Sequence, residues 1–379
     1  MKKTIVGAGL SGMVAAINLA QKGHDVEILE KAAGIGGVSL ELEAIYKQRY
    51  VFGDMTPFDL ESLSNYINVD LRHRYTEIDD NYFFKSLLLA RFYIYGKKHD
   101  LTFPEKLQVK LIERGPRKSS LDYFIYLTAL EHGVRFHFGT SIEGKDFKQL
   151  PEGTILSTGM FIGTYKMLDI PYTPISGYFA NRKMEDYNGP KVIAHFDKYM
   201  KDFCLFTLIN GVGEALLFQK NNPLTEESKK WYIKDLEEKE GITFSDWHLS
   251  EAMLAAPTAS IRNPRLFHEK FILSGTLAGM QDPFGAFGVH GALISGKIAA
   301  MAVENREKAM IEFKRMNKWW QLSYCIKKFM DVGHPLVARY LLDPFLGLLN
   351  YYDLSLLFRF VTAVPGFMEL KNNKKELPI

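Results

Sequence analysis

The chain contains little cysteine: only Cys204 and Cys325 occur in 379 residues, and they are far apart in the sequence. Two distant cysteines cannot supply the clustered thiolates of a zinc site, and they fit a reducing compartment. We therefore expect a cytoplasmic protein in which each cysteine is a small buried apolar residue rather than a catalytic thiol. No other spacing of metal-binding residue types occurs, so no metal is expected.

An excess of one charge and long apolar runs are also missing. The net charge of +3 is too small to indicate a nucleic-acid partner. No segment reaches the roughly 18 uncharged apolar residues of a transmembrane helix. With 47% hydrophobic and 24% charged residues, the composition is that of an ordinary globular protein, long enough for more than one domain. The many aromatic residues suit a large apolar ligand and a well-filled core equally, and they decide nothing.

A glycine-rich fingerprint near the N-terminus is present. Residues 4–6 predict a buried strand that leads into a tight turn at Gly7, and the apolar run to Gly23 predicts a helix that Gly12 allows to pack tightly against the strand. A second strand at residues 25–29 ends in Glu30, at the position where an acid accepts hydrogen bonds from an adenosine ribose. The turn and the helix N-terminus offer unpaired N–H groups to a pyrophosphate. The expected dinucleotide-binding residues are Gly7, Ala8, Gly9, Leu10, Ser11, Gly12, Glu30 and Lys31.

The same fingerprint has two alternatives to a nucleotide site. Lys2 and Lys3 before an apolar run to Ala20 could form a secretory signal, but a cleaved leader has no reason to carry glycines in this register. A βαβ unit without a ligand is the second alternative. The pair Gly36 and Gly37 soon after the acid resembles the extended fingerprint of flavoproteins with two dinucleotide-binding domains. That resemblance favours FAD over NAD.

The middle of the chain alternates between nucleotide-binding and strand-rich segments. Ser119 or Ser120 is a plausible N-cap for a helix that runs to His132, followed by a strand at residues 134–138. Hairpins are predicted around Gly96 and around Asn210-Gly211, the latter being a strong turn signal rather than a second nucleotide loop. The charged segment 226–240 predicts a helix with a solvated face.

A second glycine-rich stretch lies between residues 271 and 300. Residues 271–279 predict a buried strand that ends in a tight turn, and residues 294–300 predict a helix. Small residues in such a turn allow a planar ligand to approach the backbone.

This second stretch resembles the second FAD motif of flavoproteins of the para-hydroxybenzoate hydroxylase type, and most of all that of geranylgeranyl reductases. The family pattern is a strand, Gly-Asp-Ala-Ala-Gly, a proline, a glycine-bearing turn and Ala-Leu-x-Ser-Gly-x-x-Ala-Ala. The helix–strand pair at residues 117–138 also matches. The matching residues of the second motif are Gly275, Gly279, Pro283, Gly288, Ala292, Ser295, Gly296, Ala299 and Ala300.

The resemblance implies FAD as the cofactor and adds binding residues to those of the first turn. It also places His290 near the flavin pyrimidine edge, where a cation would stabilise the anionic reduced flavin. The alternative is a histidine kept neutral at a helix N-terminus. The further FAD-binding residues implied are Gly36, Gly37, Arg117, Thr158, Gly159, Gly275, Thr276, Pro283, Gly288 and Val289.

The sequence departs from the family pattern at several positions. Thr276 stands where the family has an aspartate that hydrogen-bonds the ribityl chain, and a hydroxyl would bond there more weakly. Ala286 replaces a common glycine. The Tyr-x-Trp-x-x-Pro signature of the reductase substrate domain is missing, so the substrate stays open. No second Rossmann fingerprint marks an NAD(P)H site, so the electron donor stays open too.

The tail from residue 303 has a different character from the rest. Basic residues alternate with aromatic ones between Lys314 and Lys328, and residues 334–368 are rich in Leu, Phe and Tyr. A basic amphipathic segment of this kind can lie on an anionic membrane. The alternatives are a helix that covers the core and an oligomer contact.

Together these patterns predict an α/β (α+β overall) fold in which a Rossmann-like FAD-binding domain is interleaved with an antiparallel substrate domain. The expected FAD-binding domain comprises residues 1–48, 105–174 and 255–302, the substrate domain residues 49–104 and 175–254, and a helical C-terminal region residues 303–379. The expected function is FAD-dependent reduction of carbon–carbon double bonds in an isoprenoid-like lipid. The alternatives are an NAD(P)H-dependent flavin monooxygenase and a flavin-binding protein with degenerate catalysis.

Overall fold

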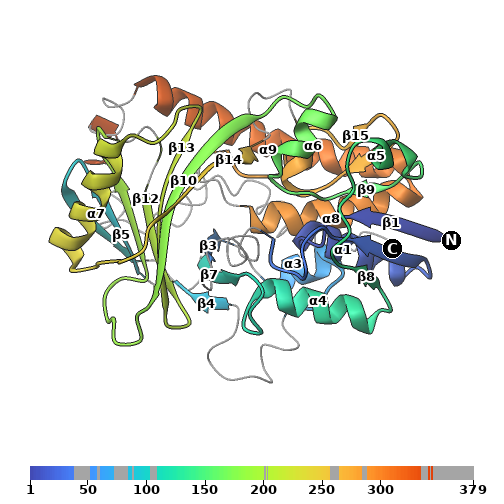
Figure 1. The fold of residues 1–379 in the computed structure, drawn as a ribbon, viewed down its shortest axis with the longest axis horizontal. Coiled ribbons are helices and arrows are strands. Elements are labelled where there is room, and N and C mark those ends of the chain that lie inside the picture. Colours follow the sequence, from blue (N-terminus) through green and yellow to red (C-terminus); the bar gives the residue numbers. More distant parts are fainter. Residues whose placement is uncertain are drawn as a thin grey trace.

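The computed structural model describes residues 1–37, 52–57, 60–71, 84–87, 89–102, 109–199, 202, 204–256, 264–283, 288–333, 340–341 and 343–344. These residues form two large sheets and one small sheet, with helices on both sides of the molecule (Figure 1). The predicted fold class is confirmed: a Rossmann-like sheet packs beside a second, mostly antiparallel sheet.

The first sheet is parallel except for one edge strand. Its order is β15-β16-β9-β1-β2-β8, and only β15 pairs antiparallel, with β16. Strands far apart in the sequence are therefore neighbours, as the predicted discontinuous nucleotide-binding sheet requires. The strand bounds are β1 Lys2–Val6, β2 Asp25–Leu29, β8 Arg135–His137, β9 Ile155–Leu156, β15 Phe267–His268 and β16 Phe271–Leu273.

Two helices that lie far apart in the sequence pack against each other beside this sheet. A Cβ atom on Gly296 of α8 (Val289–Glu304) would lie 2.4 Å from the carbonyl oxygen of Ser11 in α1 (Leu10–Ala20), so the helices touch through backbone. Their apolar residues form the largest core of the described chain, in which Val14 and Ile294 are fully buried. The other helices of this half are α3 Leu60–Ile67, α4 Leu121–Glu131, α5 Lys145–Gln149 and α6 Ile162–Met167.

The second sheet has the strand order β14-β10-β13-β12-β11-β5-β6 and is antiparallel except for the β11–β5 pair. Both predicted hairpins are confirmed. Asn210 and Gly211 have φ of 48° and 71°, the positive values that a tight two-residue turn requires. The strand bounds are β5 Leu89–Ile94, β6 Lys97–Thr102, β10 Thr173–Lys183, β11 Val192–Phe196, β12 Cys204–Ile209, β13 Val212–Lys220 and β14 His248–Ala256.

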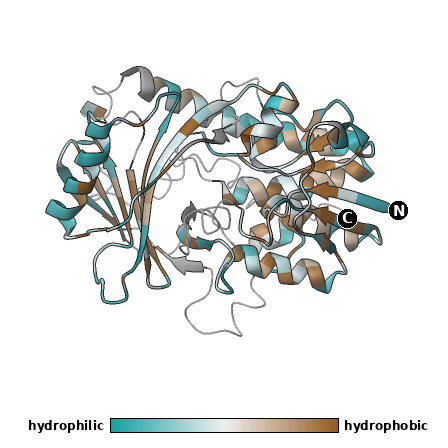
Figure 2. Cartoon of the chain, viewed as in Figure 1, coloured by the Kyte–Doolittle hydropathy of each residue, from teal (hydrophilic) through white to brown (hydrophobic). Residues whose placement is uncertain are grey.

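Helix α7 (Glu226–Glu240) covers the face of this sheet that points away from the nucleotide-binding half (Figure 1). It is mostly hydrophilic (Figure 2), which agrees with the predicted solvated face, but it buries Tyr232 and Leu236 against the sheet. Cys204 is buried in this cluster, as predicted, and burial raises the pKa of its thiol.

A small sheet of β3 (Phe52–Pro57), β7 (Val109–Arg114) and β4 (Phe84–Ser86) links the two halves. Leu111 of β7 packs with Val192 and Ile209 of the second sheet, whereas Ile112 packs into the core of the nucleotide-binding half. Adjacent residues of one strand point to opposite faces, so a single strand contributes to both cores.

Helix α9 (Arg306–Gly333) follows α8 directly and confirms the predicted helical character of residues 306–333. Most of the predicted tail at residues 334–368 lies outside the described residues, as does Ala286. Among the described residues, no helix is long and apolar enough to span a membrane.

Candidate functional site

The turn after β1 is closed by two glycines whose missing side chains allow backbone contact. A Cβ atom on Gly7, which has φ of 102°, would lie 2.3 Å from the carbonyl oxygen of Ser157 at the end of β9. A Cβ atom on Gly12 would lie 2.2 Å from the carbonyl oxygen of Gly7, so α1 starts directly against the turn. These two positions serve packing, because any larger residue would push the two strands and the helix apart.

Gly9 differs from the two other glycines of this motif. It is the N-cap residue of α1 with φ of −75° and ψ of 173°, an extended conformation that any residue can adopt. Among the described residues, the nearest atom to a Cβ there is the Ser157 carbonyl oxygen at 3.9 Å. The fold therefore does not need glycine at this position, and the open backbone is free to receive a ligand at the helix N-terminus.

Glu30 has a role within the protein in addition to its expected bond to a ribose. Its carboxylate accepts hydrogen bonds from the backbone N–H of Ala8 at 2.7 Å and from that of Ala32 at 2.9 Å. The acid at the end of β2 thus fixes the glycine turn and the following loop relative to each other. Sequence reasoning missed this brace, because the motif alone does not show where the turn amides point.

The extended fingerprint lies against the loop that carries Arg117. A Cβ atom on Gly36, with φ of 116°, would lie 2.8 Å from Pro116. Arg117 in turn pairs with the fully buried Glu113 at 3.2 Å. The structure therefore brings Gly36 and the Arg117 loop together, although 81 residues separate them in the sequence.

The helix that follows is held by a cap and a second arginine. Ser120 is the N-cap of α4 and accepts a hydrogen bond from the Tyr123 N–H at 3.1 Å, which confirms the predicted start. Asp122 forms a bidentate pair with Arg114 at 2.8 and 3.0 Å. Sequence reasoning did not find this pair, because Arg114 lies on a strand of the small sheet.

The second glycine motif meets the first one at the end of the parallel sheet. A Cβ atom on Gly275, with φ of 65°, would lie 2.6 Å from Ser11 Oγ. Ser11 Oγ is also hydrogen-bonded to Ser157 Oγ at 2.5 Å, and the Gly275 N–H donates to Ser295 Oγ at 2.7 Å. Thr276 follows in a short 3₁₀ turn (η2, Gly275–Ala278) and is half-buried.

The predicted cofactor residues fall into two groups according to their surroundings. One group is packed: Ala8, Leu10 and Val289 are buried, so only their backbone could face a ligand. In the other group, an added Cβ at Gly37, Gly159 or Gly288 would meet no atom of the described residues within 4 Å.

Thr158, next to Gly159, adds a polar group to this second group. Its buried hydroxyl has no hydrogen-bond partner in the described part of the chain, and a buried hydroxyl without a partner is costly unless a ligand or water satisfies it. Glycines with room beside their Cα atoms and a buried hydroxyl without a described partner fit a bound dinucleotide.

His290 does not lie in a position that favours a cation. Its ring is buried and stacks on Trp320 with centroids 5.2 Å apart, and burial lowers its pKa to about 4. The environment therefore fits the neutral alternative, and it is burial rather than the helix dipole that keeps the ring neutral.

The low pKa of His290 makes the stability of the protein depend on pH. Because the folded pKa lies below the unfolded value of 6.5, the unfolded chain binds more protons between pH 6.5 and about 4. We expect the free energy of unfolding to fall by about 3 kcal/mol from this residue as the pH falls through that window. Denaturant unfolding at a series of pH values should show this slope in the wild type and lose it in His290→Gln. The exposed His132→Gln should keep it, and an equal slope in all three proteins would contradict the prediction.

The face of the second sheet toward the nucleotide-binding half contains an apolar row beside a row that carries Asn181, Glu214 and Thr207. The pairing register places Phe179, Leu216 and Leu205 in the apolar row, which continues to Ala194 and Phe92. The row on its other side contains Phe218, which packs together with Leu216 on Met160 in the turn after β9. The apolar part of this face therefore begins directly beside Gly159.

One polar contact joins the same face to the second motif. Lys220, two residues after Phe218 on β13, donates from Nζ to the carbonyl oxygen of Pro283 at 3.5 Å. Pro283 thus lies where the second glycine motif meets the apolar sheet. Among the described residues, no group of three His, Cys, Asp or Glu side chains could hold a metal ion.

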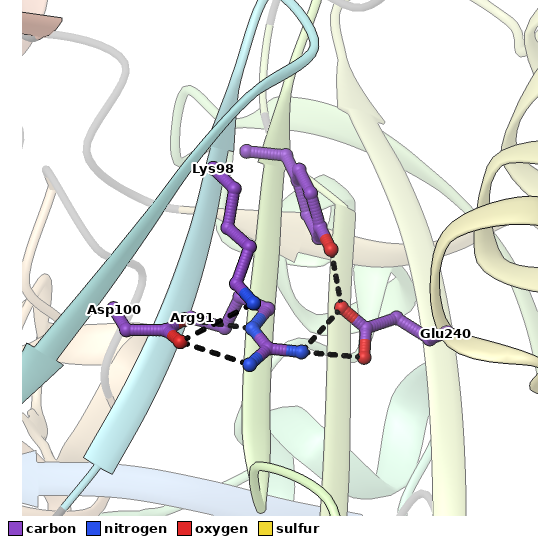
Figure 3. A network of polar contacts seen from close by, with 5 residues as sticks. Arg91, Lys98, Asp100 and Glu240 are labelled. Atoms are coloured by element: carbon purple, nitrogen blue, oxygen red, sulfur yellow. Dashed lines mark hydrogen bonds and ion pairs between the residues drawn. The ribbon is translucent and has the colours of Figure 1, made fainter.

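The opposite face of the sheet carries a charged network that anchors α7 (Figure 3). Arg91 donates to Asp100 at 2.7 and 2.9 Å and to both oxygens of Glu240 at 3.0 and 2.9 Å. Tyr93 donates to Glu240 at 2.5 Å, and burial, followed by this bond, raises its pKa. Next to it, His195 bonds Asp235 at 2.5 Å. These groups lie under α7, on the far side of the sheet from the glycine motifs.

Comparison with known proteins supports this description of the fold. Residues 5–54 match the family described as NAD(P)-binding Rossmann-like domain. No curated protein matches the chain in sequence. The fold is similar to that of a geranylgeranyl bacteriochlorophyll reductase-like protein from Thermoplasma acidophilum, with 13% identity, a TM-score of 0.66 and coverage of 98% of this chain and 100% of that one.

Two further solved structures contain FAD. A single-residue variant of Klebsiella pneumoniae HpxO, complexed with FAD, is 13% identical with a TM-score of 0.62, and the match covers 98% of this chain and 99% of that one. CtdE, in complex with FAD and a substrate, is 14% identical with a TM-score of 0.62, over 88% of this chain and 90% of that one. At these identities the likeness concerns the fold.

Proposed function

We propose that the protein binds FAD and acts as an FAD-dependent oxidoreductase. The observation that carries this proposal is the meeting of the two glycine motifs, with Gly275 against Ser11 at the end of the parallel sheet. Gly9, Thr158 and Gly159 would hold the pyrophosphate, and Glu30 the adenosine ribose. The similar FAD-containing structures support the same cofactor.

The flavin end of the cofactor would lie between the second motif and the apolar sheet. Gly288 and Pro283 would line it on one side, and Met160 and Phe218 would face it on the other. When bound, FAD supplies the transfer of an electron pair as hydride. The chain itself would orient the cofactor, exclude water with the apolar row and offer the Lys220 ammonium beside Pro283. We also propose the domain boundaries that were predicted from the sequence.

The substrate that fits this site best is hydrophobic. Leu216, Leu205 and Phe92 of the apolar row are only half-buried and carry no charge, so an apolar molecule would find apolar contacts along them. We therefore propose reduction of carbon–carbon double bonds in an isoprenoid-like lipid, in which hydride goes to one carbon and a proton to the other. The similarity in fold to the reductase-like protein supports this proposal, and a monooxygenase is the alternative that the test below separates.

A test of the proposal starts from the absorbance spectrum of the purified protein. We expect a flavin spectrum, and we expect dithionite-reduced protein under anaerobic conditions to be reoxidised by a polyprenyl lipid that gains two hydrogen atoms per double bond. Rapid NADPH-linked oxygen consumption without lipid reduction would favour a monooxygenase instead. A flavin spectrum with neither activity would indicate a flavin-binding protein without catalysis, and protein unable to take up FAD would contradict the whole proposal.

A further inference from the structure

Helix α9 has one face that nothing in the described chain covers. Its inner face buries Ala309, Phe313, Met316 and Trp320, which follow helical spacing. Ile311 and Phe329 lie on the outside, with exposed fractions of 60% and 65%. A separation of 18 residues equals about five helical turns, so these two apolar side chains point in the same direction from the two ends of the helix.

Lysines share this outer face with the apolar residues. Lys314, Lys318 and Lys328 are exposed, and at about 100° per residue they fall within about 100° of the Ile311–Phe329 line. Cys325 is exposed on the same line, which corrects the expectation that it is buried. We call this set the α9 stripe: Ile311, Lys314, Lys318, Cys325, Lys328 and Phe329.

Acidic groups are missing from the stripe. Between Ile311 and Phe329 the sequence contains a single acid, Glu312. Its side chain is buried on the other side of the helix, where it pairs with Arg315 at 2.5 Å and accepts a hydrogen bond from Tyr66. The outward charge is therefore positive along the whole stripe, which is complementary to an anionic surface rather than to a second copy of the same positive stripe.

Exposed apolar side chains also concentrate in this part of the chain. Four of the seven large hydrophobic residues that the described chain leaves exposed are Ile311, Phe329, Tyr340 and Leu341. Alternating exposed apolar and basic residues on one helix face fit the boundary between lipid headgroups and acyl chains.

We propose that the α9 stripe docks the protein on an anionic membrane surface, with Ile311 and Phe329 inserted and the three lysines on lipid headgroups. This surface is separate from the redox site: binding to vesicles requires neither FAD nor substrate, so the two proposals can fail independently. Each lysine near an anionic surface strengthens binding about fivefold.

Vesicle flotation of the full chain tests the proposal. We expect the protein to float with vesicles that contain about 30 mol% phosphatidylglycerol, a strongly anionic composition, and to stay in the soluble fraction with phosphatidylcholine alone. High salt should weaken binding, because it screens the lysines. The double variant Ile311→Glu/Phe329→Glu should lose at least about tenfold in vesicle affinity. The triple change of Lys314, Lys318 and Lys328 to Gln should lose about 100-fold on anionic vesicles.

Matched controls use equivalent residues elsewhere on the surface. Leu130→Glu and Met167→Glu replace exposed apolar residues of other helices, and Lys230→Gln/Lys234→Gln replaces exposed lysines of α7. These variants should bind like the wild type, and unchanged thermal unfolding would show that all variants fold. Wild-type protein that never floats, or an Ile311→Glu/Phe329→Glu variant that floats fully, would overturn the proposal. A wild-type dimer that is dissociated by Ile311→Glu/Phe329→Glu would also overturn the proposal, because the α9 stripe would then contact a second copy of the chain.

Discussion

Replacement of Gly9 by aspartate is expected to give a folded protein that purifies without flavin. Gly9 has extended backbone angles and open space where a Cβ would lie, so the fold accepts a side chain there. Aspartate is also a favourable N-cap, which should leave the stability of α1 equal or higher. A carboxylate at this point would face the pyrophosphate, and such like-charge contact costs several kcal/mol, or at least about 100-fold in FAD affinity.

The measurement combines FAD titration with thermal unfolding of the FAD-free protein. Gly12→Ala is the contrasting variant: its Cβ would lie 2.2 Å from the Gly7 carbonyl oxygen, so it should lose stability as well as flavin. Gly23→Ala, in the turn after α1, is expected to keep full FAD affinity, because a Cβ there meets no described atom within 4 Å; its positive φ would cost stability alone. Full FAD affinity in Gly9→Asp would place the cofactor elsewhere and contradict the site.

Replacement of Arg91 by methionine should strongly destabilise the α7 side of the sheet. The guanidinium joins Asp100 on β6 to Glu240 at the end of α7, and the Glu240 side chain is only 5% exposed. Removal of one partner of a buried pair leaves an uncompensated charge and costs about 3–5 kcal/mol. Because the Asp100 end is more exposed, we expect a loss of about 3 kcal/mol in urea unfolding followed by the fluorescence of Trp231 and Trp247.

A second change separates the unpaired charge from the lost packing. In the Arg91→Met background, Glu240→Gln should restore part of the stability, because it removes the buried carboxylate that has lost its partner. Arg135→Met is the surface control: Arg135 pairs with Asp25 where both side chains are half exposed, so no measurable change is expected. If Arg91→Met and Arg135→Met lowered the free energy of unfolding equally, burial would not explain the cost of removing Arg91.

The sequence by itself determined the elements that depend on local rules. The turn at Gly7 and the Asn210-Gly211 hairpin need positive φ, which few residue types adopt, and the Ser120 cap needs a side chain that accepts a hydrogen bond; all three are found where they were predicted. A Rossmann-like parallel sheet was also predictable, because the strand–turn–helix–strand unit at residues 4–30 has the spacing of a dinucleotide-binding unit. Such signals are short in range, so a single sequence suffices to identify them.

Only the tertiary structure decided which groups from distant segments meet. The brace from Glu30 to Ala8, the contact of Gly275 with Ser11 and the stacking of His290 on Trp320 depend on how the units pack, which no local pattern encodes. The charge of His290 is the clearest case. The sequence allows either a cation or a neutral ring for His290. Burial against α9 favours the neutral ring, because removal from water penalises the charged form.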